Sequence, residues 1–126
     1  MGSGRSSVKP VRQTIFGKPD GNCFQACVAS LLEVPLEEVP SFTEKWWLEL
    51  EAWLESRGLA PLLLTWPLAK GSYFCLDTHY IACGLAGRGL RHSVIYKNQE
   101  LIHDPHPDNT GLVEEPDTVI LFVRKG

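Results

Sequence analysis

The chain has 126 residues, of which 44% are hydrophobic and 21% charged, and its formal net charge at pH 7 is -3. These values are typical of a single globular domain with its own core, and they favour neither nucleic acid nor an anionic membrane as a partner. The longest apolar runs are much shorter than a membrane-spanning helix.

The first ten residues are polar and begin with Met1-Gly2-Ser3-Gly4, so residues 1–10 are expected to be a disordered tail, in part vector-derived. A single domain is expected over residues 11–126. No signal peptide is visible, which favours a cytoplasmic protein or an effector delivered to another cell. Residues 11–16 are predicted to be extended, and they carry Gln13.

A turn made of Pro, Asp and Gly leads into Asn22 and Cys23. Apolar side chains then recur at the spacing of one helix face, which predicts a helix over residues 23–33 that ends before Pro35. Asn22 is a favoured N-cap, and Gln25 follows three residues later, so the two predict a variant of the capping box. In the first helical turn, free backbone N–H groups and the helix dipole favour a thiolate. Cys23 is therefore the candidate nucleophile, and a purely structural core cysteine is the alternative.

Two further helical segments are expected before the strands begin. Residues 36–39 are expected to form one turn, and a second helix is predicted over residues 42–57, with Ser41 and Glu44 as a capping box and Gly58 as its end. The apolar stripe of this helix is interpreted as core, and it consists of Trp47, Leu50, Trp53 and Leu54. Strands are predicted at residues 60–65, 79–85 and 118–123, with a connection at residues 66–71 and a glycine-rich turn at residues 87–89. Helices followed by antiparallel strands predict an α+β domain.

A β-hairpin is predicted over residues 90–104. If its loop centres on Asn98, His92 lies directly across from Asp104 and the two side chains share one face of the sheet. If the turn has two residues instead, Asp104 faces Ser93 and the pair with His92 is broken. The sequence leaves both registers open.

In the first register, Asp104 orients the imidazole of His92, which takes a proton from Cys23. The order Cys23, His92, Asp104 resembles that of the papain-like cysteine peptidases, most closely their short C39-like members of bacterial and phage type. Those members share an Asn-Cys or Asp-Cys step that opens a helix, a strand beginning His-x-Val-[Val/Ile], and an Asp-Pro step followed by a glycine. Here the last two features are Asp104-Pro105 and Gly111.

The resemblance covers residues 11 to 112 and implies a papain-like fold. N-terminal helices would carry the nucleophile, and they would pack on an antiparallel β-sheet that carries the histidine and the aspartate. The Asp-Gly-Asn-Cys string is also similar to ovarian-tumour-type deubiquitinases, but the residues after Cys23 fit the C39-like pattern better.

The family's oxyanion glutamine lies upstream of the nucleophile, and Gln13 is the only glutamine in that part of the chain. Asn22, next to Cys23, is the alternative side-chain donor. Trp66 and His106 are candidate substrate-binding residues. Their structural alternatives are a half-buried aromatic ring at a strand end and an ordinary solvated loop histidine.

The four cysteines do not predict disulfides. Cys23 and Cys27 lie one helical turn apart, which is a poor geometry for a bridge, and Cys75 and Cys83 are interpreted as small core residues, so a reducing compartment is expected. The alternative is a zinc site made of Cys23, Cys27, His103 and His106. A Cys-x-x-x-Cys spacing within a helix lacks the knuckle glycine of a structural zinc site, and Asp104 would have no role. We therefore expect no metal and no cofactor.

Three classes of function follow from these residues. The leading one is a cysteine hydrolase that cleaves an amide or peptide bond of a peptide or protein through a thioester intermediate. The second is a papain-like deamidase or a transglutaminase-type acyl-transfer toxin, whose chemistry is identical up to the thioester. The third, a non-catalytic binding module, does not require three reactive side chains in catalytic order.

Overall fold

The computed structural model describes residues 8–15, 22–65, 78–87 and 91–125. The interpretations of the Pro-Asp-Gly turn, of Trp66 and of Cys75 fall outside these residues. The elements are α1 (Cys23–Leu32), the short 3-10 helix η2 (Leu36–Glu38), α2 (Trp46–Glu55), β1 (Leu59–Thr65), β2 (His79–Leu85), β3 (Arg91–Lys97), β4 (Glu100–His103) and β5 (Thr118–Arg124).

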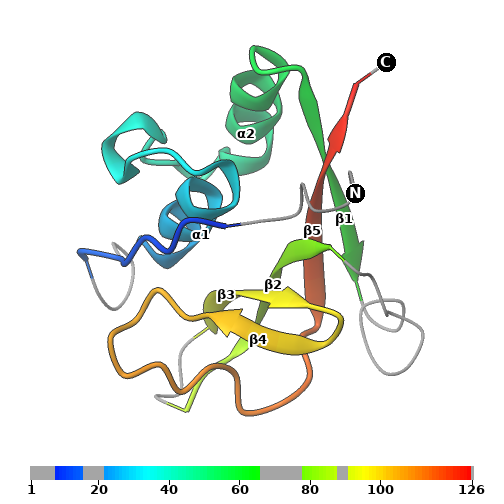
Figure 1. Cartoon of the computed structure of the whole chain (residues 1–126). Coiled ribbons are helices and arrows are strands. Elements are labelled where there is room, and N and C mark those ends of the chain that lie inside the picture. The colour runs from blue at the N-terminus through cyan, green and yellow to red at the C-terminus, as the bar shows by residue number, and fades with distance from the viewer. Residues whose placement is uncertain (1–7, 16–21, 66–77, 88–90, 126) are drawn as a thin grey trace.

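The strands form one antiparallel sheet in the order β1-β5-β2-β3-β4. Helix α1 packs against β2 and β3, and α2 packs against β1 (Figure 1). The predicted α+β class, with helices first and an antiparallel sheet after them, is confirmed. Neither helix of the described chain is long and apolar enough to cross a lipid bilayer.

The hydrophobic core has two parts, one on each face of the sheet. The larger part joins the helices to the sheet and is centred on Cys27, Val28, Leu50, Leu54, Ile81, Ile95 and Ile120. The smaller part consists of Tyr80, Ala82, Val94 and Val119. Alternation along β2, β3 and β5 assigns neighbouring residues to opposite faces, as the period of a strand requires.

The first described residues, from Val8 onward, pack on the domain, whereas the sequence predicted a disordered tail over residues 1–10. The side chains of Val8 and Val11 lie against the larger core. The backbone N–H of Lys9 donates to the carbonyl of Ser30 at 3.1 Å. The buried imidazole of His103 donates from Nε2 to the carbonyl of Val11 at 2.8 Å. These bonds fix the segment that carries Gln13.

Helix α1 starts at Cys23 as predicted, but the predicted capping box is absent. Asn22 occupies the N-cap position without a side-chain cap bond. Its Oδ1 instead accepts the N–H groups of Thr14 and Ile15, each at 3.0 Å. Gln25 donates from Nε2 to the carbonyls of Leu36 and Val39, at 3.2 Å and 2.6 Å. Both side chains thus make tertiary bonds that compete with capping, and a local pattern does not reveal these partners.

Helix α2 begins at Trp46, four residues later than predicted, and the capping box of Ser41 and Glu44 does not form. Glu49 in its first turn reaches back, and its carboxylate accepts from the backbone N–H and the hydroxyl of Thr43 at 2.8 Å and 2.6 Å. The helix ends at Glu55, two residues before the predicted end, and Gly58 follows with φ +75°, a left-handed conformation that glycine accepts without strain.

The β3–β4 hairpin follows neither of the two predicted registers along its whole length. Its turn has two residues, with Lys97 opposite Glu100, and Asn98 and Gln99 both have positive φ, as in a type I′ turn. Further along, Ile95 pairs with His103, so Ile102 is an extra residue in a β-bulge. Of the two alternatives, the two-residue turn at Asn98 and Gln99 is confirmed and the loop centred on Asn98 is wrong, but the bulge shifts the register beyond Tyr96.

The bulge decides which face Asp104 occupies. Continued by one residue, the shifted register sets Asp104 opposite Val94, on the face that Val94 shares with His92 two residues earlier. Without the extra Ile102, Asp104 would lie opposite Ser93 and point away. His92 and Asp104 are thus diagonal neighbours across the hairpin, close enough for a hydrogen bond.

Candidate active site

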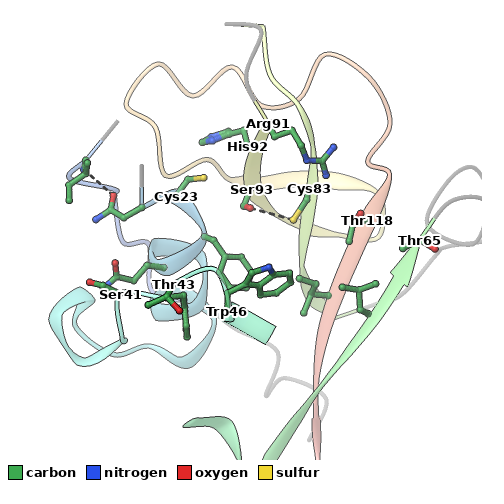
Figure 2. Close-up of a pocket in the computed structure, with 17 residues that line it drawn as sticks. Cys23, Ser41, Thr43, Trp46, Thr65, Cys83, Arg91, His92, Ser93 and Thr118 are labelled. Carbon is green, nitrogen blue, oxygen red and sulfur yellow. Dashed lines mark hydrogen bonds between the residues drawn. The ribbon is translucent and has the colours of Figure 1, made fainter. Parts of the chain in front are cut away.

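Three elements bring Cys23, His92 and Asp104 together. Cys23 is the first residue of α1, His92 is the second residue of β3, and Asp104 follows the end of β4. Figure 2 shows the sulfur of Cys23 beside the ring of His92. The Nε2 of His92 lies 2.6 Å from Oδ1 of Asp104, and His92 and Cys23 are close enough for each to shift the pKa of the other.

The carboxylate of Asp104 is fully buried and held from three sides. Its Oδ1 accepts from Nε2 of His92 and from the backbone N–H of His106 at 2.9 Å, and its Oδ2 accepts from the N–H of Gly111 at 2.8 Å. Burial alone would raise the pKa of Asp104, but the bonds from these three donors and the charge of His92 lower it to about 2. Asp104 is therefore an anion at neutral pH.

The imidazole of His92 lies between two groups that favour its charged form. Burial disfavours the charge, but hydrogen bonds to Asp104 and Cys23, together with the charges of both, raise the pKa of His92 to about 9. His92 is thus an imidazolium at neutral pH. With Nε2 committed to Asp104, Nδ1 is the ring nitrogen available to Cys23.

The thiol of Cys23 is ionised more readily than an ordinary cysteine. Burial raises its pKa, but the hydrogen bond and charge of His92, followed by bonds from the backbone and the hydroxyl of Ser93, give a net lowering. Its position in the first turn of α1 adds the unpaired N–H groups of a helix N-terminus. The arrangement favours the thiolate of Cys23 beside the charged His92, with Asp104 on the other side of the histidine ring.

The other described cysteines have the opposite character. Burial raises the pKa of Cys27 well above its ordinary value, and the nearby Cys23 adds to this effect. Burial also raises the pKa of Cys83 to about 11, although a bond with the hydroxyl of Ser93 partly opposes it. Among the described cysteines, Cys23 is therefore the one whose thiol pKa is lowered and whose thiolate is favoured.

The two candidate oxyanion donors lie close to the site but are engaged elsewhere. Gln13 is buried beside the Asp104-Pro105 step, where its N–H donates to the carbonyl of Pro105 at 3.1 Å. Its Nε2 donates to the carbonyl of Ile15 at 3.0 Å, while its Oε1 has no partner among the described residues. Asn22 lines the pocket beside Cys23, and its Nδ2 donates to the hydroxyl of Thr14 at 3.0 Å.

The remaining histidines have separate positions. The ring of His106 lies edge-on to that of His92, with centroids 6.3 Å apart, and its Nδ1 accepts from the N–H of Asp108. His103 is buried against the N-terminal segment, where its Nε2 donates to the carbonyl of Val11. His79 begins β2, and burial together with the charge of Lys97 lowers its pKa. Among the described residues, no three His, Cys, Asp or Glu side chains are gathered as a metal site would require.

A pocket with a volume of about 820 Å³ opens at Cys23 and His92 and extends between the helices and the sheet (Figure 2). Its helix side carries the aromatic rings of Phe24, Phe42 and Trp46. Its sheet side carries Leu63, Thr65, Cys83, Arg91, Ser93, Thr118 and Ile120, and its remaining lining residues are Ile15, Asn22, Gln25, Ser41 and Thr43.

Sequence reasoning missed Ser93 and Trp46. Ser93 is one of the residues that lower the pKa of Cys23, and only its position directly after the candidate base hinted at this role. Trp46 lines the pocket, whereas the predicted aromatic stripe began one residue later. Both depend on how α1, α2 and β3 pack together, which no local pattern specifies.

Comparisons of the chain with family models, with curated proteins and with solved structures found no match. No family is therefore assigned to it.

Proposed function

We propose that the protein is a papain-like cysteine hydrolase that cleaves an amide or peptide bond of a peptide or protein. The observation that carries the proposal is the grouping of Cys23, His92 and Asp104 at the pocket: His92 is hydrogen-bonded to Asp104 and lies beside Cys23, the thiol pKa is lowered, and the imidazole pKa is raised to about 9. A thiol with a lowered pKa, next to an imidazole and at a helix N-terminus, is the arrangement that nucleophilic catalysis by cysteine uses.

In the proposed reaction, the Cys23 thiolate attacks the carbonyl carbon and the carbonyl π electrons move to oxygen. As the tetrahedral intermediate collapses, the C–N bond breaks and the imidazolium of His92 gives its Nδ1 proton to the leaving amine. A thioester remains. The neutral His92 then takes a proton from water, whose oxygen attacks the thioester, and a carboxylic acid leaves as the thiolate is restored. Asp104 stays ionised and holds the ring throughout.

The negative oxygen of the intermediate needs donors, and the backbone N–H of Cys23 is the first that we propose. Gln13 and Asn22 are the proposed side-chain donors. Asn22 is favoured by its place on the pocket wall, and Gln13 by its burial beside the Asp104-Pro105 step. Either amide would have to exchange its present acceptor for the oxyanion.

An acyl-transfer enzyme is the second candidate, since a deamidase or a transglutaminase-type toxin would form the same thioester. A module that only binds peptides is less well supported, because binding gives no reason for the lowered thiol pKa of Cys23.

The test is a competition among the cysteines, followed by a search for the acyl donor. Iodoacetamide at pH 7 with peptide mapping should modify Cys23 well before Cys27, Cys75 and Cys83. An electrophilic probe in a lysate, followed by mass spectrometry of adducts on Cys23, then reports the acyl group. Equal labelling of all four cysteines in the folded protein would refute the proposed nucleophile.

A further inference from the structure

The sheet side of the pocket includes one row of short polar side chains that crosses four strands. Ser93 pairs with Cys83 across β3 and β2, Cys83 pairs with Thr118 of β5, and Thr118 pairs with Thr65 of β1. We call these four residues the polar row. All four line the pocket, and Figure 2 shows them in order from the side of His92 to β1.

The space above the polar row is open, whereas larger side chains fill the space above the neighbouring row of the sheet. On each strand, the residue two positions from the polar row points to the same face of the sheet. These residues pack against the helices in the larger core, and they are Ile95, Ile81, Ile120 and Leu63. Serine, cysteine and threonine are shorter, so the space above them stays open. Leucine or isoleucine at these positions would fill the space.

The wall opposite the polar row is aromatic. The ring of Phe24 meets those of Phe42 and Trp46 edge to face, with centroids 5.7 Å and 5.4 Å away. Figure 2 shows the indole of Trp46 extended toward the strands. Aromatic faces offer large apolar contact areas to a bound side chain.

The pocket presents little net charge to a ligand. Arg91 and His92 are the charged side chains among its described lining residues. Arg91 donates two bonds to the carboxylate of Asp117, at 2.7 Å and 2.8 Å, and His92 is paired with Asp104. A charged substrate side chain would lose its hydration here without gaining an unpaired partner.

From these contacts we propose that the pocket binds the acyl side of the substrate, as an extended peptide with a large uncharged apolar side chain against Trp46. This inference rests on the proposed function of Cys23. The leaving amine must pass His92 to receive its proton, so the acyl side lies toward Ser93 and the polar row. Hydroxyl groups on the floor suit the amides of a peptide, which a hydrocarbon chain lacks.

The length of the polar row determines how many residues of an extended peptide it can contact. Neighbouring strands lie roughly 4.8 Å apart, so the four residues span roughly 14 Å, or about four residues of an extended chain. The hydroxyl of Thr118 donates to Asp117 at 3.0 Å, which leaves its lone pairs to accept a substrate N–H. Recognition by this row is therefore a backbone contact, and Trp46 supplies the selection for side-chain size.

The test uses acetyl-tripeptidyl chloromethyl ketones in which one Phe is moved through an all-Ala sequence. The rate of Cys23 alkylation by each is divided by the rate with iodoacetamide, which corrects for thiolate reactivity. We expect at least one Phe position to react roughly tenfold faster than the all-Ala compound, as burial of one large side chain allows. Trp46→Ala should abolish this preference. Thr118→Leu, which fills the hollow, should do the same.

Trp53→Ala is the matched control, because Trp53 lies on the same helix, stacks on Arg57 at 4.4 Å and does not line the pocket. It should keep the preference for Phe. Equal rates for every compound, or a preference that survives in Trp46→Ala, would overturn the assignment of the subsite. If iodoacetamide does not favour Cys23 in any variant, it is the proposed function that fails.

A binding measurement on an inactive variant separates failure of the proposed subsite from failure of the proposed function. The ¹⁵N-labelled Cys23→Ala variant is titrated with the acetyl-tripeptide amide that carries Phe at the preferred position. If no position is preferred, the three peptides with one Phe are titrated in turn. Shifts of the Trp46 indole N–H and of the Thr118 and Thr65 amides are expected with Phe and much weaker with the all-Ala peptide. No shifts at these three groups, or equal shifts with both peptides, would overturn the proposal whatever the reactivity of Cys23.

Discussion

The ionisation of Cys23 depends on two consecutive residues of β3. His92 supplies a hydrogen bond and a positive charge, while Ser93 supplies a backbone and a hydroxyl donor. Burial opposes all of these contributions, so the thiol pKa is low only while they are intact.

Replacement of His92 by alanine should move the pH at which Cys23 becomes reactive. His92→Ala removes the largest favourable contribution and leaves burial, so the midpoint of iodoacetamide labelling should rise toward the free-thiol value of about 8.5 or above. Ser93→Ala should give a smaller rise, since the backbone donor remains. Rates of labelling from pH 5 to pH 10 measure both midpoints. His79→Ala is the control, because it makes the same substitution at a histidine outside the site. An unchanged pH profile in His92→Ala would show that another residue is the base.

The side chain of Asn22 connects the N-terminal segment to the start of α1. It accepts the N–H groups of Thr14 and Ile15 and donates to the hydroxyl of Thr14. Asn22→Ala should therefore speed amide hydrogen exchange at Thr14 and Ile15 by roughly tenfold or more, as loss of one hydrogen bond's net contribution implies.

Asn22→Asp is the matched variant, because its carboxylate keeps the two acceptor bonds. Exchange at these amides should stay near the wild-type rate in Asn22→Asp. If both variants exchange at the wild-type rate, the side chain of Asn22 does not hold the segment, and Gln13 is positioned by Pro105 and Ile15 alone.

Among the elements, the β3–β4 hairpin determines the geometry of the site. Its strand pattern, its polar turn and the identity of His92 and Asp104 could be read from the sequence, because alternation and turn residues are local signals. The bulge at Ile102 could not be predicted. Its position reflects how β4 packs across β3 and how the buried carboxylate finds donors at His106 and Gly111, which lie beyond the strand.

Deletion of Ile102 should break the pair that the bulge creates. Without the extra residue the two-residue turn continues in regular register, and Asp104 moves to the face of Ser93. Turnover of a substrate found with the probe should fall by roughly 100-fold or more, because His92 loses its orienting anion. Ile102→Ala is the control, since it keeps the number of residues and changes only a partly exposed side chain. Wild-type turnover in the deletion variant would show that the bulge does not set the position of Asp104.

At the level of the whole molecule, the sequence indicated the reactive triad better than the pocket. Cys23, His92 and Asp104 are chemically distinctive residues in a characteristic order. The polar row is not visible in the sequence, because Ser93, Cys83, Thr118 and Thr65 are ordinary residues that meet only when four strands take one particular register. Long-range register depends on packing of the entire core, so the grouping of Cys23, His92 and Asp104 was predictable and the lining of the pocket was not.

The free energy of unfolding of the domain should depend on the ionisation of Asp104 at acid pH. Its pKa is about 2 in the folded protein against an ordinary 3.8. A carboxyl group with a lowered pKa stabilises the fold above its unfolded pKa, and this stability is lost as the pH falls through the folded pKa. The group is fully buried, so its contribution at pH 6 is on the order of 2 kcal/mol.

Asp104→Asn should therefore be less stable than the wild type at pH 6, also because its amide N–H groups would face the donors of His92 and Gly111. Part of the difference should disappear between about pH 4 and pH 2, where the wild type loses the contribution of its carboxylate. Denaturant unfolding of both proteins at intervals across this range measures the gap, and other acidic groups cancel because both proteins carry them. Asp108→Asn, in the same loop, controls for loss of one negative charge and should stay close to the wild-type curve. If the difference in free energy of unfolding between wild type and Asp104→Asn is constant from pH 6 to pH 2, the folded pKa of Asp104 is not near 2. The bonds from His92, His106 and Gly111 would then not hold this carboxylate as an anion.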